Sequence, residues 1–305
     1  MGPIPRSPLL NEQTEKRTLK FYIADVFGTG RYSGNQLAVF TNAINISDTE
    51  MQQIAREINF SETTFISGQN QSQNEYNVRI FTPGNEVPFA GHPTIGTAYI
   101  ILDRLLGNKS TNIALHVKAG KIPVHRDTDI MWMKQLQPVF GRIFDKPAIA
   151  GILGLNVSDI SENIPVQEVS TGLPFIIVPL IGNEAVIKAK VNKELSGKLL
   201  ADSKTKEFMV FSINKESKTD KAKARVFVEE FGIPEDPATG SANGCLAAYM
   251  LQYNLFNSNK ISLSVAQGYE IGRPSRIYIK ADRQGEVFDI HIGGRVNIVA
   301  EGYWY

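Results

Sequence analysis

The chain is poor in the residues that build disulfide frameworks and metal sites. Its 305 residues include one cysteine, Cys245, and four histidines. A single cysteine excludes an intrachain disulfide framework and a thiolate metal cluster. The histidines stand at positions 92, 116, 125 and 291, and no close pair such as His-x-x-x-His occurs. We therefore expect no metal ion, and the low cysteine content fits a reducing, cytoplasmic setting.

Long apolar runs and a strong net charge are also missing. No run reaches the ~18 apolar residues of a bilayer-spanning helix, so we expect no membrane segment. The formal net charge is +1, which gives no overall field toward nucleic acid or anionic lipid. Residues 1–18 carry three prolines and mixed polar groups without an apolar stretch. We expect them to form a flexible leader rather than a signal peptide.

The chain is long enough for two domains, each with its own core. Hydrophobic residues make up 42% of it and charged residues 21%, as in ordinary globular proteins. A turn at 127–129 precedes a new strand, so we expect one domain over 19–129 and another over 130–305. The last segment, about 294–305, is aromatic and extended, and it is a candidate to return to the first domain.

An internal repeat is the most informative positive feature. The segment 78–81 leads through a short turn into 88–100, and the segment 224–227 leads into 235–250. Each copy reads as a β-branched strand, a Pro/Gly turn with an ionisable group, and a helix of small residues. Such repetition predicts two related halves that face each other. Two helix N-termini, a histidine from one half and an aspartate from the other would then meet in one cleft.

Strand patterns dominate the rest of the chain, and helix patterns are fewer. The segment 48–59 is an amphipathic helix with Ser47 or Asp48 as its N-cap, because its apolar residues recur at i, i+3, i+4 and i+7. The repeat helices, 94–106 and 242–253, are apolar nearly all round, which predicts burial inside a curved sheet. Weaker helix patterns cover 147–155 and 183–199.

His92 is the first candidate for chemistry. It lies in Gly91-His92-Pro93, directly before a predicted helix. A helix N-terminus presents free N–H donors and binds anions, and a histidine there can move a proton near neutral pH. The alternative is a core histidine bonded to a backbone carbonyl, but the turn context favours a functional residue.

Asp236 is the corresponding residue of the second copy. It precedes Thr239, Gly240 and Ser241, which supply hydroxyls and bare N–H groups where the helix begins. Asp236 alone would read as a helix cap or turn residue. The Thr-Gly-Ser that follows predicts a cradle for a carboxylate, and it does not match a P-loop.

Glu62 and Cys245 are less clear from their own segments. Glu62 follows the amphipathic helix and, taken alone, reads as a solvent-facing strand residue. It would be a general acid or base only in a dry cleft that raises its pKa. Cys245 lies in the apolar stripe of the second repeat helix, where a buried structural cysteine is expected.

Several motifs occur in a fixed order from residue 21 to about 298. They are Asp25-Val26-Phe27, Gly34-Asn35, Ala38-Val39-Phe40, Ser61-Glu62-Thr63-Thr64-Phe65, Glu86-Val87-Pro88-Phe89-Ala90-Gly91-His92-Pro93-Thr94, Glu235-Asp236-Pro237-Ala238-Thr239-Gly240-Ser241-Ala242 and Gly268-Tyr269-Glu270-Ile271-Gly272-Arg273-Pro274-Ser275. Together they resemble the PhzF family of phenazine biosynthesis, which has the diaminopimelate-epimerase-like fold. The resemblance implies an α/β (α+β) protein of two pseudo-symmetric domains, each a curved, mostly antiparallel or mixed sheet around a central helix.

The same resemblance implies the site and the activity. The site would lie in the cleft between the domains, with no cofactor, in a homodimer. The family's catalytic groups fall on Glu62, His92 and Asp236, and the groups that hold a substrate carboxylate fall on Gly91, Gly240 and Ser241, with Asn35 and Ser61 as further binding candidates. The family's best-known reaction is the isomerisation of trans-2,3-dihydro-3-hydroxyanthranilate, in which Glu62 would take a proton from C3 and return one to C1.

Three functions remain open at this point. The leading one is a cofactor-independent isomerase of a small carboxylate. The second is an epimerase or racemase of another small acid, although the two-thiol mechanism of related epimerases is excluded because Ala90 and Pro237 stand in the corresponding turns. The third is a non-catalytic member that binds a ligand or a protein in the same cleft.

Overall fold

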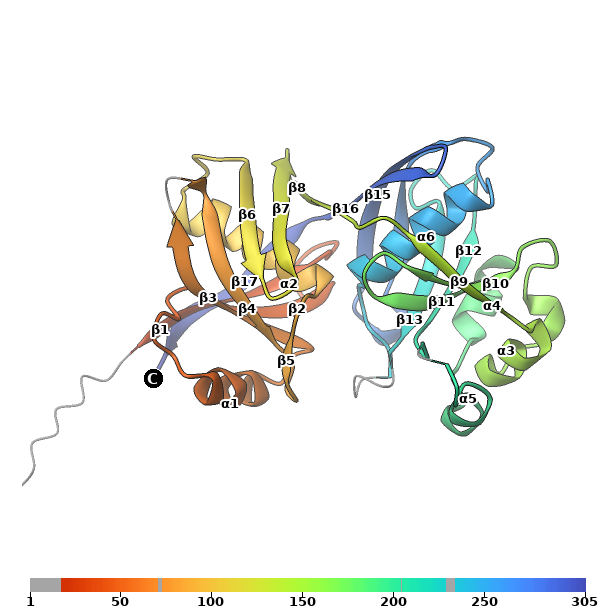
Figure 1. The fold of residues 1–305 in the computed structure, drawn as a ribbon, viewed down its shortest axis with the longest axis horizontal. Helices are drawn as coiled ribbons and strands as arrows, with labels where there is room; N and C mark the ends of the chain where they lie inside the picture. Colours follow the sequence, from red (N-terminus) through yellow and green to blue (C-terminus); the bar gives the residue numbers. More distant parts are fainter. Residues whose placement is uncertain (1–17, 71–72, 204, 229–233) are drawn as a thin grey trace, which may run out of the picture.

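The computed structural model describes residues 18–70, 73–203, 205–228 and 234–305. The expected leader therefore lies outside the described residues, except for Thr18. Figure 1 shows two lobes side by side, with one helix held within the sheet of each. All described strands belong to one hydrogen-bonded network that runs through both lobes.

The first lobe is a curved sheet around the helix α2 (Gly91–Ile100). Its strands pair in the order β17-β1-β2-β3-β4-β6-β7-β8, with β2–β3 and β4–β6 parallel and the other pairs antiparallel. The strands are β1 (Leu19–Val26), β2 (Asn35–Phe40), β3 (Glu62–Asn70), β4 (Glu75–Phe81), β5 (Glu86–Val87), β6 (Asn112–Val117), β7 (Gly120–Asp127), β8 (Ile130–Lys134) and β17 (Val296–Trp304).

The second lobe repeats this topology around α6 (Gly240–Gln252). Its order is β9-β10-β11-β12-β13-β14-β15-β16, with β11–β12 and β13–β14 parallel and the other pairs antiparallel. The strands are β9 (Val139–Phe144), β10 (Val166–Ser170), β11 (Pro174–Pro179), β12 (Phe208–Ile213), β13 (Ala222–Phe227), β14 (Lys260–Gln267), β15 (Ser275–Gln284) and β16 (Val287–Gly294). The matching order and directions confirm the expected fold class of two pseudo-symmetric units.

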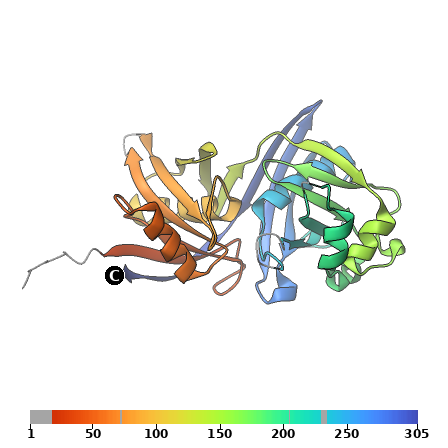
Figure 2. The same ribbon diagram turned by 60° about the horizontal axis from the view of Figure 1, so that its bottom comes forward.

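Two strands link the lobes. The end of β16 pairs with β8, and the chain then continues as β17, which lies antiparallel to β1. Figure 2 shows this last strand running back through the first lobe. Since β8 is hydrogen-bonded to β7, we propose that the first unit extends through Lys134 rather than ending near residue 130, and that β17 is part of it.

The helices follow the expected pattern with two corrections. α1 (Asp48–Ile58) begins after the Ser47 cap and ends at Asn59, and α3 (Lys146–Leu153) matches the weaker pattern. The repeat helices begin earlier than expected, at Gly91 and Gly240, and α2 ends in a π-helical turn over Ile101–Leu105.

The single helix expected over 183–199 is wrong. The structure has two helices there, α4 (Gly182–Lys188) and α5 (Lys193–Leu199). The chain leaves helical geometry at Ala189, and the Asn192 side chain caps α5 by accepting from the Leu195 N–H. A new N-cap with its own first turn begins a separate helix.

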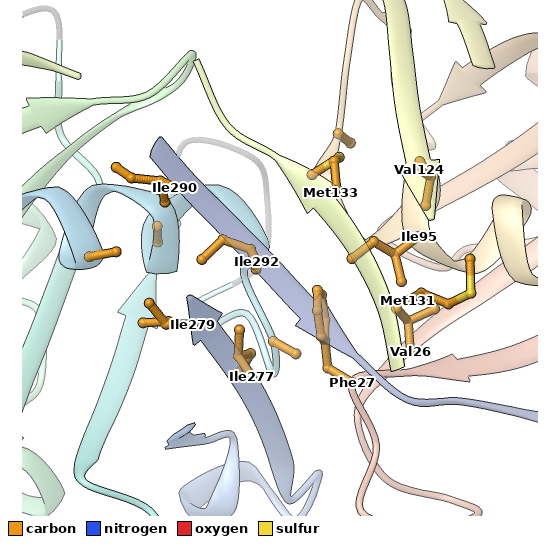
Figure 3. Packing of buried hydrophobic residues seen from close by; sticks show 14 of the residues in the cluster. Val26, Phe27, Ile95, Val124, Met131, Met133, Ile277, Ile279, Ile290 and Ile292 are labelled. Atoms are coloured by element: carbon orange, nitrogen blue, oxygen red, sulfur yellow. The ribbon is translucent and has the colours of Figure 1, made fainter. Parts of the chain in front are cut away.

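The main core runs across the junction of the lobes, and Phe27 lies where the two halves meet. Figure 3 shows its ring between Ile277 and Ile292 of the second lobe and Val26 of the first. Phe27 is fully buried and has a φ of 62°, which is rare for a bulky residue. Backbone bonds hold it on both sides: its N–H donates to the Arg295 carbonyl, and its own carbonyl accepts from the Arg276 N–H, each at 2.8 Å.

Within the described ranges, no helix has both the length and the apolar character needed to cross a bilayer.

Candidate functional site

The two repeat helices begin against each other at the junction of the lobes. A Cβ added to Gly91 would lie 3.3 Å from the Ser241 backbone nitrogen and 3.5 Å from the Gly240 Cα. No side chain in the described ranges caps the N-terminus of either helix. The first N–H groups of α2 and α6 therefore remain available as donors, and two such ends together favour an anionic group.

Glu62 and His92 meet beside these helix ends. Glu62 is the first residue of β3 and His92 is the second residue of α2. The Glu62 Oε2 atom lies 3.5 Å from the His92 Nε2 atom, and the side chains are 19% and 6% exposed. Neither atom has a hydrogen-bond partner among the described residues. Buried polar atoms are normally satisfied, so both atoms are well placed to bond a ligand.

Burial sets the protonation of this pair. It raises the pKa of Glu62 to about 8, and the charge of Asp236 adds to the rise. Burial also lowers the pKa of His92 to about 3, against the effect of a hydrogen bond to the Gln36 backbone. At neutral pH Glu62 is therefore mostly protonated and His92 is neutral, so the two do not form an ion pair. A carboxyl with a pKa near 8 is suited to take and return a proton near neutral pH.

Asp236 lies across the junction from Glu62 and has a full set of partners. Asn35, at the start of β2 in the first lobe, donates from Nδ2 to the Asp236 Oδ1 atom at 2.8 Å. The Thr239 hydroxyl donates to the other carboxylate oxygen. Burial raises the pKa of Asp236, and these two hydrogen bonds oppose the rise. The carboxylate is thus a buried acceptor shared between the lobes.

The remaining predicted residues differ in how closely they join this cluster. Ser241 is 5% exposed in the first turn of α6, opposite Gly91. Gly240 approaches the Phe27 ring, because an added Cβ would lie 3.3 Å from its Cζ atom. Ser61 is half-buried directly before β3, and in the described part of the chain no hydrogen bond joins it to the other site residues.

Sequence reasoning missed two contributors to this region. Arg273 joins the lobes: its Nη2 atom lies 2.6 Å from the Asp25 Oδ1 atom, and its Nε donates to the Gly34 carbonyl at 2.9 Å. Gln267, fully buried at the end of β14, bonds to the Asp236 turn. Arg273 stood in a quoted motif, but its partner is 248 residues away in the chain, so no local pattern could pair them.

Cys245 is not part of the reactive groups. It is fully buried in α6, and burial raises the pKa of its thiol to about 12. The thiolate is the nucleophilic form, so this thiol is inert at neutral pH. Across the ranges that the structure describes, no three His, Cys, Asp or Glu side chains gather in a way that could hold a metal ion.

Comparison with known proteins gives consistent matches over nearly the whole chain. The family model for phenazine biosynthesis-like proteins (PhzC-PhzF) matches residues 24–302. A Clostridium acetobutylicum protein named as an uncharacterized isomerase is 32% identical over 93% of this chain and 97% of its own. The trans-2,3-dihydro-3-hydroxyanthranilate isomerase of Pseudomonas aeruginosa is 31% identical over 94% of this chain and 99% of its own.

Solved structures agree on the fold. A PhzF-family phenazine biosynthesis protein from Bacillus anthracis superposes with a TM-score of 0.86 at 27% identity, covering 95% of this chain and 99% of the other. A probable proline racemase from Agrobacterium radiobacter superposes with a TM-score of 0.61 at 9% identity, covering 93% and 92%. The second likeness concerns the fold alone.

Proposed function

The chain belongs to the phenazine biosynthesis-like (PhzC-PhzF) family, and from that premise we propose that it is an isomerase that shifts a proton on a small carboxylate without a cofactor. The relatives named as isomerases, among them the Pseudomonas enzyme at 31% identity, support the reaction class. The observation that carries the proposal is the pair of unpartnered atoms, Glu62 Oε2 and His92 Nε2, beside two uncapped helix ends.

Each group has a role in this reaction. The substrate carboxylate accepts hydrogen bonds from the N–H groups at Gly91, Gly240 and Ser241, where the helix ends offset its charge. Glu62 in its ionised form takes a proton from carbon and, as the acid, returns one to another carbon. For trans-2,3-dihydro-3-hydroxyanthranilate, the substrate named for the Pseudomonas relative, these carbons are C3 and C1.

His92 and Asp236 orient the substrate in this proposal. His92 is neutral, so its ring nitrogen offers a hydrogen bond without a charge that would compete for the substrate carboxylate. Asp236 fixes Asn35 at the junction, and its negative charge keeps the Glu62 pKa high. Asn35 and Ser61 complete the binding residues. We also propose a cytoplasmic homodimer, whose mass by light scattering would be twice the 33.8 kDa of the chain.

Deuterium exchange tests the proposal. The protein is incubated in deuterated water with candidate carboxylates, beginning with trans-2,3-dihydro-3-hydroxyanthranilate, and carbon-bound deuterium is followed by NMR. We expect Glu62→Gln to lower exchange by roughly 10²–10⁴-fold, the usual contribution of a general acid or base, while ligand binding persists. Glu75→Gln is the matched control, because Glu75 at the start of β4 binds His116 of β6 and Lys121 of β7 and, within the described structure, no residue of the site.

The kind of exchange separates the three functions. Deuterium incorporation with a shifted double bond supports the isomerase, and incorporation with inverted configuration indicates an epimerase instead. Binding without exchange indicates a non-catalytic member. Exchange by Glu62→Gln at the wild-type rate would exclude Glu62 as the base.

A further inference from the structure

A network of buried hydrogen bonds connects Asp236 to Asn243 of α6 and to Gln267 of β14. Gln267 and Asn243 are both fully buried. The Gln267 Nε2 atom donates to the Asp236 carbonyl at 2.9 Å and to the Thr239 Oγ1 atom at 3.1 Å. Asn243 donates from Nδ2 to the Gln267 Oε1 atom at 3.0 Å and to the Thr239 carbonyl at 2.9 Å.

The partners fix the direction of both amides. If the Gln267 amide were reversed, its oxygen would face the Asp236 carbonyl, and its NH₂ would face the Thr239 N–H that now donates to Oε1 at 3.4 Å. Reversal of Asn243 would place an oxygen against two acceptors. With both amides in this orientation, Gln267 donates to the Thr239 hydroxyl oxygen and Asn243 donates to the Thr239 carbonyl.

This direction decides what the Thr239 hydroxyl does. Its oxygen already accepts from Gln267, so its single hydrogen goes to the Asp236 Oδ2 atom. With Asn35 donating to Oδ1, both carboxylate oxygens accept. An aspartate whose two oxygens only accept is stabilised in its ionised form.

We propose that Gln267 and Asn243 are positioning residues of this site, which aim the Thr239 hydroxyl at Asp236 and thereby hold that carboxylate in its charged, acceptor form. The consequence reaches Glu62 on β3, because the fixed negative charge across the junction raises the pKa of the Glu62 carboxyl. The assignment rests on the proposed function for its effect on catalysis, but the protonation of Asp236 and Glu62 is measurable without a substrate.

Among the residues that the structure describes, few charged groups face this carboxylate. Glu62 of β3 approaches from the first lobe, with neutral His92 of α2 beside it. Glu235 of the same turn also raises the pKa of Asp236, but its own carboxylate is held by Arg225 of β13 at 2.7 and 3.0 Å. Among these, Glu62 is the unpaired group that reports the state of Asp236.

The test follows the Glu62 carboxyl by carbon-13 NMR in glutamate-labelled protein, over a pH titration without ligand. Glu62→Gln assigns the signal that titrates near neutral to alkaline pH. Thr239→Val removes the hydroxyl with little change in volume, and Gln267→Met removes the amide. In both we expect Asp236 to accept a proton more readily and the Glu62 midpoint to fall by roughly one pH unit, since a neighbouring charge shifts a pKa by about 1–3 units.

Two variants serve as controls. Thr239→Ser keeps the hydroxyl and should keep the wild-type midpoint. Gln167→Met removes another buried glutamine, which donates to the Gly141 carbonyl at 3.1 Å and accepts from Tyr253 at the far end of α6, and it should also leave the midpoint in place.

The outcomes are separable. A lower midpoint in Thr239→Val and Gln267→Met, with both controls unchanged, supports the assignment. An unchanged midpoint in folded Thr239→Val overturns it, even if Gln267→Met fails to fold, and so does an equal fall in Gln167→Met. If a substrate is known, the pH–rate profile should move with the midpoint. Absence of turnover would contradict the proposed function alone, because the titration needs no substrate.

Discussion

The two turns that begin α2 and α6 have the same backbone design but opposite polar environments. Each presents a glycine at the first helical position and an uncapped helix end. In the first turn the His92 Nε2 atom and the nearby Glu62 Oε2 atom have no partner in the described structure. In the second turn both oxygens of Asp236 are bonded.

The difference shows how two copies of one scaffold can carry side chains with different roles. Backbone N–H groups at a helix start favour an anion whatever the side chains are, so we propose that both copies bind the substrate carboxylate there. The side chains are free to differ, and the first lobe keeps groups available for a ligand while the second lobe holds a fixed charge. The predictions below test that asymmetry, from the largest expected effect to the smallest.

The largest effect is expected for a substitution in the first turn, where the His92 Nε2 atom has no hydrogen-bond partner in the described structure. We expect His92→Gln to lower the exchange rate by roughly 10²-fold or more, because misplacing the substrate by about 1 Å already costs about that much. The pH profile should keep its shape, because the His92 pKa of about 3 leaves the ring neutral throughout the neutral range. Rates measured across pH check this, and a profile displaced relative to wild type would contradict it.

A smaller loss of exchange rate is expected for a substitution in the second turn, where both oxygens of Asp236 are hydrogen-bonded. Asp236→Asn keeps the shape of the side chain but removes the negative charge that raises the Glu62 pKa. We expect the rate to fall by roughly 10–100-fold and the pH profile to move to lower pH, since desolvation alone then holds the Glu62 pKa up. If Asp236→Asn and His92→Gln changed the pH profile in the same way, the proposed difference between the two turns would be wrong.

Closing the space between the turns should weaken binding moderately. In Gly91→Ala the new methyl group lies 3.3 Å from the Ser241 backbone nitrogen, so it obstructs an N–H that the carboxylate would use. We expect about a tenfold loss of affinity, or about 1.4 kcal/mol, by calorimetry. Gly151→Ala is the control, because nothing lies near its added Cβ. Equal affinities for the two variants would show that the carboxylate binds elsewhere.

The smallest effect concerns stability. The pKa of Glu62 is about 8 in the folded protein, against an ordinary value of 4.5. The folded protein keeps a proton that the unfolded chain releases, so this group lowers stability as pH rises from 4.5 to about 8. We expect Glu62→Gln to raise the Tm by a few degrees, by a margin that grows over this window and then stays constant.

Thermal unfolding at about pH 5, 7 and 9 measures that margin. A margin that does not change with pH would mean that Glu62 titrates alike in the folded and unfolded chain. The Glu75→Gln variant provides the comparison. Hydrogen bonds from Lys121 and His116 lower the Glu75 pKa from its ordinary value of 4.5. Its stabilising contribution is therefore lost only as the pH falls below that value, and its margin should not change between about pH 5 and 9.

Much of the secondary structure was readable from local pattern. The amphipathic spacing gave α1 to within one residue of its observed end. The repeat helices were predicted to start at 94 and 242, but they start at Gly91 and Gly240. Pro93 and the glycines read as turn residues, although the first helical turn tolerates proline because its N–H groups need no intrahelical partner.

The sequence by itself determined the repeated strand-turn-helix units and the kinds of polar group in each turn, because these follow from side-chain spacing along a short segment. The family resemblance came from the order of several motifs along nearly the whole chain. Only the tertiary structure decided that Asn35 bonds Asp236 across 201 residues, and that Glu62 and His92 lie together in a buried place. A carboxyl pKa near 8 depends on desolvation and on a charge from the other lobe. Both the desolvation and the nearby charge arise from the packing of the chain, so the order of the residues alone cannot predict them.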